Sequence, residues 1–103
     1  METLSCPIEG YEDFTITVKT IPEWKVSDHT RYADAVQDAF DSKSLAESDT
    51  LDKARWFGSF ALCDKVEGFP DEPLDDLPLG VYRWLLNVVY YNNFDKALNP
   101  EKN

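Results

Sequence analysis

The sequence predicts a small α+β domain that is rich in helix, and three observations support this fold class. Apolar and polar residues alternate from Phe14 to Lys19, which is the two-residue period of a half-buried strand. Residues 28–40 carry apolar side chains at helical spacing, and residues 77–97 read as a longer, more apolar helix. Because a lone strand is not stable, we expect two or three helices packed on a short strand pair.

The whole chain, residues 1–103, has the size of a single domain with one core. Pro7 and Gly10 indicate an irregular lead-in over residues 1–11. Small polar residues predict a flexible loop over residues 41–50, and residues 99–103 read as a frayed tail.

The first strand comes to an end before Pro22, and a first helix follows it. Ser27 or Asp28 is expected to cap this helix, which runs to about Phe40. Its apolar residues fall on one face, as is typical of a helix that packs on a core through a single stripe.

Residues 51–63 fit two structures. Leu51, Ala54 and Gly58 follow helical spacing, and Ser48, Asp49 or Thr50 could cap such a helix. The aromatic residues at 56, 57 and 60 also suit a buried strand. We favour a helix to about Phe60 with strand character toward Leu62, and we place the second strand near residues 60–66. Whether residues 56–63 form helix or strand stays open at this point.

The last helix has the strongest start signal in the chain. Asp75 or Asp76 is expected to cap it, with Pro78 in the first turn. From Val81 to Phe94 it is apolar on nearly every side, and a helix of that kind is buried. Because the chain has little material to surround it, the pattern predicts surplus apolar surface that is covered by a partner protein or by a second copy.

The chain carries 20 acidic and 10 basic residues and a net charge of −10. Such a surface repels the phosphates of nucleic acids, so a nucleic acid is not an expected partner. A basic protein partner fits this charge, and so does a simple need for solubility.

Cys6 and Cys63 have no C-x-x-C spacing and no neighbouring histidine, which argues against a zinc site. The first five residues do not resemble a signal peptide, and the apolar run from Trp84 to Tyr91 is too short to cross a membrane. We therefore expect a cytoplasmic protein with two free thiols.

No catalytic motif is apparent. His29 is the only histidine, and we expect it to be exposed near a helix start. The acidic residues from Asp71 to Asp76 lack the spacing of a calcium loop. We expect a protein that is not an enzyme and has no cofactor or metal; an enzyme with scattered catalytic residues is a less favoured alternative.

Aromatic residues are the remaining unusual feature. Trp56 is expected in the core. Large apolar residues on the last helix are candidate anchors for a partner, because tryptophan and tyrosine are enriched at interface hot spots. These candidate partner-binding residues are Trp84, Val88, Tyr90, Tyr91 and Phe94.

The segment from Gly68 to Pro100 carries a Gly-Phe-Pro-x-x-Pro loop, then Leu-Asp-Asp-Leu-Pro before a helix that ends in Phe-Asp-Lys-Ala-Leu-Asn-Pro. With the preceding strand and helix, this order resembles the small tail assembly chaperones and related tail-morphogenesis proteins of long-tailed bacteriophages. The resemblance implies a binding role in the host cytoplasm. The chain would shield apolar helices of the tape-measure protein and help tail-tube subunits gather around it.

A second reading follows from charge alone. The chain could be an acidic inhibitor that mimics DNA and blocks a nucleic-acid-binding protein. Against it, the acids are spread over loops and caps and are not spaced like phosphates along one face.

Overall fold

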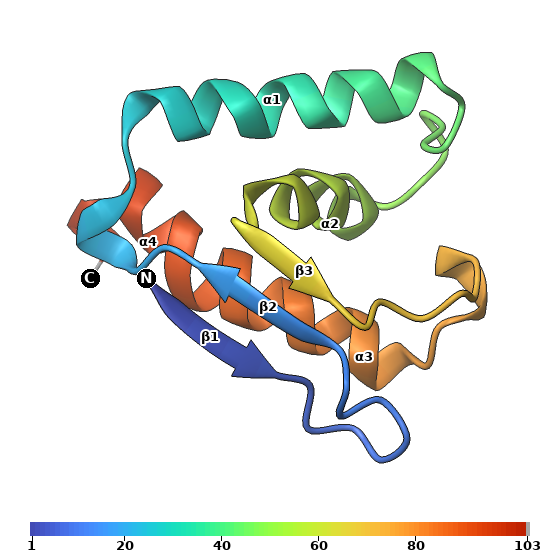
Figure 1. Cartoon of the computed structure of the whole chain (residues 1–103). Coiled ribbons are helices and arrows are strands. Elements are labelled where there is room, and N and C mark those ends of the chain that lie inside the picture. Colours follow the sequence, from blue (N-terminus) through green and yellow to red (C-terminus); the bar gives the residue numbers. More distant parts are fainter. Residues whose placement is uncertain (103) are drawn as a thin grey trace.

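The computed structural model describes residues 1–102 and confirms an α+β domain. Its main elements are strands β1 (Glu2–Ser5), β2 (Thr15–Val18) and β3 (Lys65–Glu67), helices α1 (Val26–Asp41) and α2 (Leu51–Leu62), and a last helix made of α3 (Leu79–Leu85), η3 (Leu86–Phe94) and α4 (Asp95–Leu98). Short 3₁₀ turns add η1 (Ile21–Glu23), η2 (Leu74–Asp76) and η4 (Pro100–Lys102). In Figure 1 the sheet lies in front of the last helix, and α1 crosses above α2.

The sheet has three antiparallel strands in the order β1-β2-β3, where the sequence predicted a pair. Alternation in β2 turns Ile16 and Val18 into the core, which confirms the expected strand, and β3 lies at the end of the region proposed for its partner. Strand β1 lies within residues 1–11, where an irregular segment was predicted, and that prediction was wrong. Its own residues are mostly exposed, so its conformation depends on pairing with β2, for example Leu4 with Ile16.

Helix α1 begins two to three residues earlier than predicted, with Lys25 at the N-cap. Asp28 acts from the third helical position: its carboxylate accepts the backbone N–H of Lys25 at 2.9 Å and the ammonium of Lys19 at 2.8 Å. The prediction that Ser27 or Asp28 is the capping residue was therefore wrong. Asp28 lies within the first turn of the helix, where its carboxylate binds Lys25 and Lys19.

Helix α2 settles the ambiguous segment as helix through Leu62, so the expected strand character there was wrong. Thr50, one of the three candidate caps, accepts the backbone N–H of Lys53 at 3.2 Å. Gly58 lets α1 approach closely, since a Cβ at this position would lie 2.3 Å from the ring of Tyr32. Trp56 is buried in the core, as expected.

The last helix was predicted from Leu77 and begins at Leu79, with Pro78 at the N-cap and no side-chain cap. Asp75 and Asp76 belong to the preceding 3₁₀ turn η2, so their predicted capping role was wrong. Leu77 lies between that turn and the helix, and its side chain is buried. Leu77 therefore separates the two acidic residues from the helix start.

The middle of this helix, η3, is π-helical, a form that periodicity arguments did not predict. At its end the backbone N–H of Asp95 bonds the carbonyl of Tyr90, five residues back. Buried residues recur in pairs every four positions: Leu85 and Leu86, Val89 and Tyr90, Asn93 and Phe94.

Residues 42–50 contain turns and bends without helix or strand, in the place of the predicted flexible loop. The predicted frayed tail contains η4, and Asn103 lies outside the described residues. Within residues 1–102, no helix is both long and apolar enough to cross a membrane.

Candidate functional site

The structure divides the five predicted partner-binding residues into two groups. Tyr90 and Phe94 are core residues, 6% and 1% exposed, so neither side chain projects from the surface. Trp84, Val88 and Tyr91 are half-buried.

Tyr90 and Phe94 are covered because α1 packs over them. The ring of Tyr32 stands 5.9 Å from the ring of Tyr90 and 5.3 Å from that of Phe94, and Trp24 covers Phe94 from a further side at 5.1 Å. The sheet, α1 and α2 thus enclose most of the apolar helix. The sequence argument that the chain lacks material to do so was wrong.

Tyr91 is held by a polar cluster between α2 and the last helix. Its hydroxyl accepts a hydrogen bond from Arg55 at 2.9 Å and donates one to the carboxylate of Asp52, which also pairs with Arg83 at 2.7 Å. Both guanidinium groups stand 5.5 Å from the Tyr91 ring. The hydroxyl group of Tyr91 therefore makes its hydrogen bonds within the chain.

Trp84 and Val88 lie on the same side of the last helix as Gly80, one and two turns along. Trp84 packs against Phe14 at 5.5 Å between ring centroids, and Ile8 approaches Gly80 closely. Trp84 therefore extends the core toward the chain that links β1 to β2, and Val88 packs against the core.

Two thiols and one imidazole, those of Cys6, Cys63 and His29, are the side chains considered for chemistry. Burial raises the pKa of the Cys63 thiol to about 12, a tendency that nearby Arg31 opposes, so at neutral pH it is the poorly nucleophilic thiol. Both cysteines are free. His29 is exposed at the first turns of α1, as expected, with its ring 6.2 Å from Phe94. Across the described part of the chain, no group of three or more His, Cys, Asp or Glu side chains is placed to hold a metal ion.

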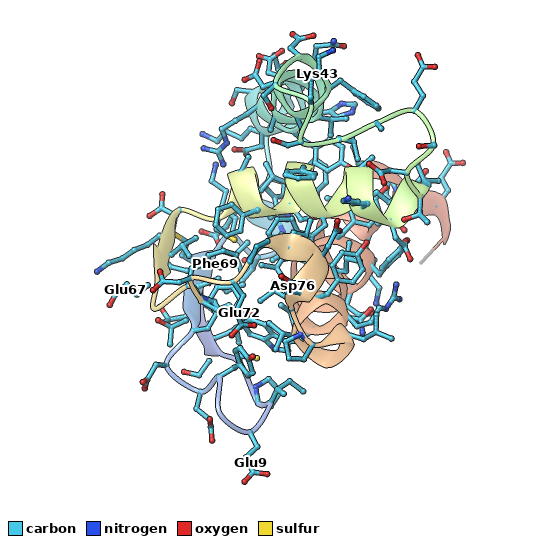
Figure 2. The ribbon with its side chains drawn as sticks, turned by 90° about the vertical axis from the view of Figure 1, so that its right-hand side faces the viewer. Glu9, Lys43, Glu67, Phe69, Glu72 and Asp76 are labelled. Carbon is cyan, nitrogen blue, oxygen red and sulfur yellow. The ribbon has the colours of Figure 1, made fainter. Side chains whose placement is uncertain are left out.

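Two acidic loops lie together at one end of the molecule. Residues 7–13 and 67–78 contain eight carboxylates and no lysine or arginine: Glu9, Glu12, Asp13, Glu67, Asp71, Glu72, Asp75 and Asp76. The hydroxyl of Tyr11 donates to Glu72 at 3.0 Å, and Gly68, at φ +67°, lies so close to the carbonyl of Asp13 that a Cβ would meet it at 2.1 Å. Figure 2 faces this end and labels four of the acids.

The most exposed apolar side chains gather in two places that sequence reasoning missed. At the end that holds the first residues of β1 and the end of α4, Val26 is 84% exposed and Leu98 is 36% exposed. Between them lies a groove lined by Trp24, Lys25, Val26, His29, Phe94, Ala97 and Leu98, which we call the terminal groove. Phe94, a predicted anchor, thus forms part of its floor.

The second place lies between the starts of α2 and α3. Leu51 and Leu79, the first residues of these helices, are 64% and 72% exposed. A groove beside them is lined by Thr50, Lys53, Leu74, Asp75, Leu77, Leu79 and Tyr82, and we call it the helix-start groove. Helical periodicity does not show that such residues are exposed, because the first residue of a helix has no preceding turn of that helix beside it.

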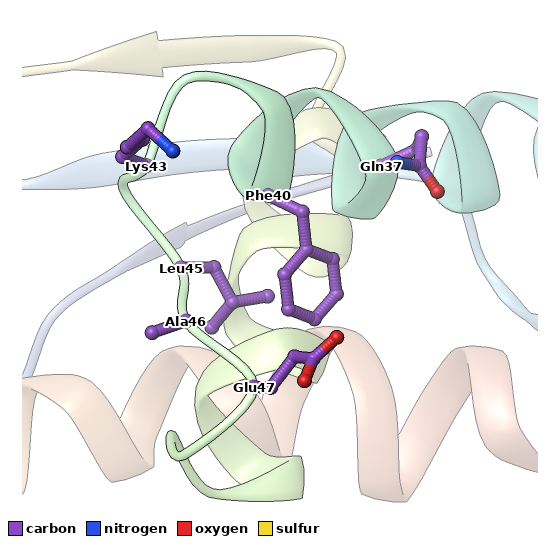
Figure 3. Close-up of a pocket in the computed structure, with 6 residues that line it drawn as sticks. All are labelled: Gln37, Phe40, Lys43, Leu45, Ala46 and Glu47. Atoms are coloured by element: carbon purple, nitrogen blue, oxygen red, sulfur yellow. The ribbon is translucent and has the colours of Figure 1, made fainter.

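A third hollow, at the end of α1, is shown in Figure 3. Phe40 and the buried Leu45 form its apolar part, and Gln37, Lys43 and Glu47 surround them. Leu45 is fixed by its backbone N–H, which donates to Ala39 at 3.0 Å. This contact ties residues 42–50 to α1, so the hollow is the inside of a surface turn.

Comparisons with protein-family models, with curated proteins and with solved structures found no match to this chain.

Proposed function

We propose that this chain is a non-enzymatic protein-binding domain, and that its terminal groove holds the apolar face of a partner helix. The observation that carries the proposal is the exposure of Val26 and Leu98 on either side of a groove floored by Phe94. Nearby Met1 and Ile21 are 54% and 42% exposed, which extends the apolar area.

The physical case is the gain from covering these side chains. Burial of one exposed valine or leucine contributes about 1.5–3 kcal/mol, and aromatic residues at the centre of a contact carry much of the binding energy. Trp24 and Phe94 are already ordered by their mutual contact at 5.1 Å, so little side-chain entropy is lost on binding. A groove of this form suits an amphipathic helix.

The resemblance of residues 68–100 to phage tail assembly chaperones indicates which partner the groove would bind. In that setting the partner is an apolar helix of a tape-measure or tail-tube protein, bound in the host cytoplasm. The alternative occupant is a second copy of the chain, which its net charge of −10 disfavours.

The test begins with affinity capture from the native host and identification of the partner by mass spectrometry, followed by binding measurements with both purified proteins. We expect the Val26→Ser/Leu98→Ser variant to lose binding by about tenfold or more. The control is Ala33→Ser/Asp34→Asn on the exposed face of α1. Equal binding by both variants would overturn the proposal, provided that circular dichroism shows both to be folded.

The second candidate function is that of an acidic inhibitor that mimics DNA. It is kept because the fold brings the two acidic loops to one end of the molecule, where Tyr11 hydrogen-bonds Glu72. For this candidate, Asp71→Asn/Glu72→Gln would abolish partner binding and Val26→Ser/Leu98→Ser would not. The identified partner would also be a nucleic-acid-binding protein, and DNA would compete with the chain for it.

A further inference from the structure

We propose that the helix-start groove is a second, independent docking site, and that it takes an apolar anchor side chain from a lysine- or arginine-rich amphipathic segment of a partner protein. The site lies apart from the terminal groove and does not depend on it. Two properties of the groove indicate this occupant. The groove has an apolar floor with exposed leucines beside it, and the negative charge around it is unbalanced.

The apolar part of the groove is built from two stretches of chain, residues 74–77 and the start of α3. Leu74 and Leu77 come from η2 and the residue that follows it, and Tyr82 comes from the first turns of α3. The groove encloses about 350 Å³, at the lower end of the size of small-ligand sites. It therefore fits an anchor side chain, and the exposed Leu51 and Leu79 offer further contact to the residues beside that anchor.

The charges around the groove are unbalanced. Lys53 is the only cation that lines it, and its ammonium is bound by Asp49 at 3.4 Å and by Asp75 at 3.2 Å. The hydrogen bond that Lys53 donates to Asp75 is the largest cause of its raised pKa, so the lysine stays charged and paired. Asp76 is exposed, and the Asp75 side chain is 81% exposed.

Asp49 and Asp75 therefore share one ammonium, and Asp76, the exposed neighbour of Asp75 in η2, adds a third carboxylate to this part of the surface. The starts of α2 and α3 add partial positive charges of about half a unit each, which offset only part of this excess. The remaining charge favours a cationic partner. It disfavours a second copy of this chain, whose net charge is −10.

The probe for this site is a synthetic helical peptide of leucine and lysine with one apolar face, labelled with a fluorophore. Binding to the full chain is followed by fluorescence anisotropy, and the site is mapped by amide chemical shifts. A peptide of the same composition in scrambled order tests the need for an apolar face, and a leucine–glutamate peptide tests the need for positive charge.

We expect shifts concentrated at residues 50–53 and 74–82. Leu51→Ser/Leu79→Ser should weaken binding by about tenfold or more, and serine is well tolerated at helix starts, so folding should persist. Asp76→Asn should weaken binding by a few fold, and Asp38→Asn, which removes an equal charge from the exposed face of α1, should not.

Three results would overturn the proposal. They are undiminished binding by the double leucine variant, equal binding of the scrambled or acidic peptide, and loss of binding by Val26→Ser with shifts at the terminal groove. The last result would place the peptide in the terminal groove and would leave the proposed function standing. Conversely, if Val26→Ser/Leu98→Ser binds the captured partner normally, the proposal for the helix-start groove is unaffected.

Discussion

At the scale of single residues, the buried polar groups decide how the last helix is fixed to the sheet. Asn93 is 5% exposed and is satisfied on both sides of its amide. Its nitrogen donates to the carbonyl of Lys19 at 2.8 Å, and its oxygen accepts from the indole N–H of Trp24 at 2.8 Å. One side chain therefore joins the helix to the end of β2 and to a wall of the terminal groove.

Replacement of Asn93 by alanine leaves both partners without a hydrogen bond in a buried place. We expect Asn93→Ala to lower the free energy of unfolding by about 2–4 kcal/mol, measured by urea denaturation. The neighbouring Asn92 is exposed, and Asn92→Ala is the matched control, with an expected change within about 0.5 kcal/mol. Equal losses in the two variants would contradict the role assigned to Asn93.

At the scale of elements, the contact between α1 and α2 depends on a glycine. Tyr32 lies over Gly58, and its ring is confined from the other side by Tyr90 and Phe94. In an exposed helix, replacement of glycine by alanine would be favourable by about 1 kcal/mol. Here the added methyl group has no space, because the Tyr32 ring cannot move away.

We expect Gly58→Ala to be destabilising by about 1–3 kcal/mol despite its better helix propensity. In a Tyr32→Leu background the same change should cost less, because the confined ring is gone. Thermal and urea denaturation of the two single variants and the double variant would give the coupling between the sites. A more stable Gly58→Ala protein would show that the helices can separate at no cost.

The elements also show how far the sequence was sufficient. Strand β2 and helix α1 could be predicted because their side-chain periods are local properties of the chain. Strand β1 could not, since only Leu4 of its residues is even half-buried and its pairing partner lies beyond a turn. The π-helical winding of η3 has no period that short patterns reveal.

The candidate site was predicted less well, for a related reason. The apolar character of residues 81–94 was correctly recognised, but exposure depends on what packs against each side. Tyr32 and Trp24 cover Phe94, and neither contact is visible in the sequence. Val26 and Leu98 were missed because the apolar area that they form joins residues far apart in the sequence.

At the scale of the whole molecule, stability depends on pH through carboxylates that are paired in the fold. Burial alone would raise the pKa of Asp28, but hydrogen bonds from Lys19 and from the backbone of Lys25 outweigh it and lower the pKa. The pKa of Glu23 is lowered as well, to about 2, first by the chain's amino terminus and then by Thr20. A lowered pKa in the folded state means that the stabilisation is present above the unfolded value and is lost as pH falls through the folded value.

We therefore expect the free energy of unfolding to decrease as pH falls below about 4, near the ordinary pKa of aspartate. Above that range the trend is opposed, because the net charge of −10 diminishes toward the pI of 4.3 and relieves repulsion. Asp28→Asn should be less stable at neutral pH and should show a shallower acid dependence. Urea denaturation from neutral pH to about pH 2 measures both, and an unchanged slope would contradict the role of Asp28.

The location of the terminal groove bears on how the protein is handled. The first residues of β1 and the end of α4 lie at the same end of the molecule, beside Val26 and Leu98 (Figure 1). An affinity tag fused at either end would hang over the surface on which a partner is proposed to settle, and its linker could compete with that partner. The turn around Lys43 lies at the opposite end of α1 from Val26, so it offers an insertion point for a tag or a fluorescent label away from the terminal groove.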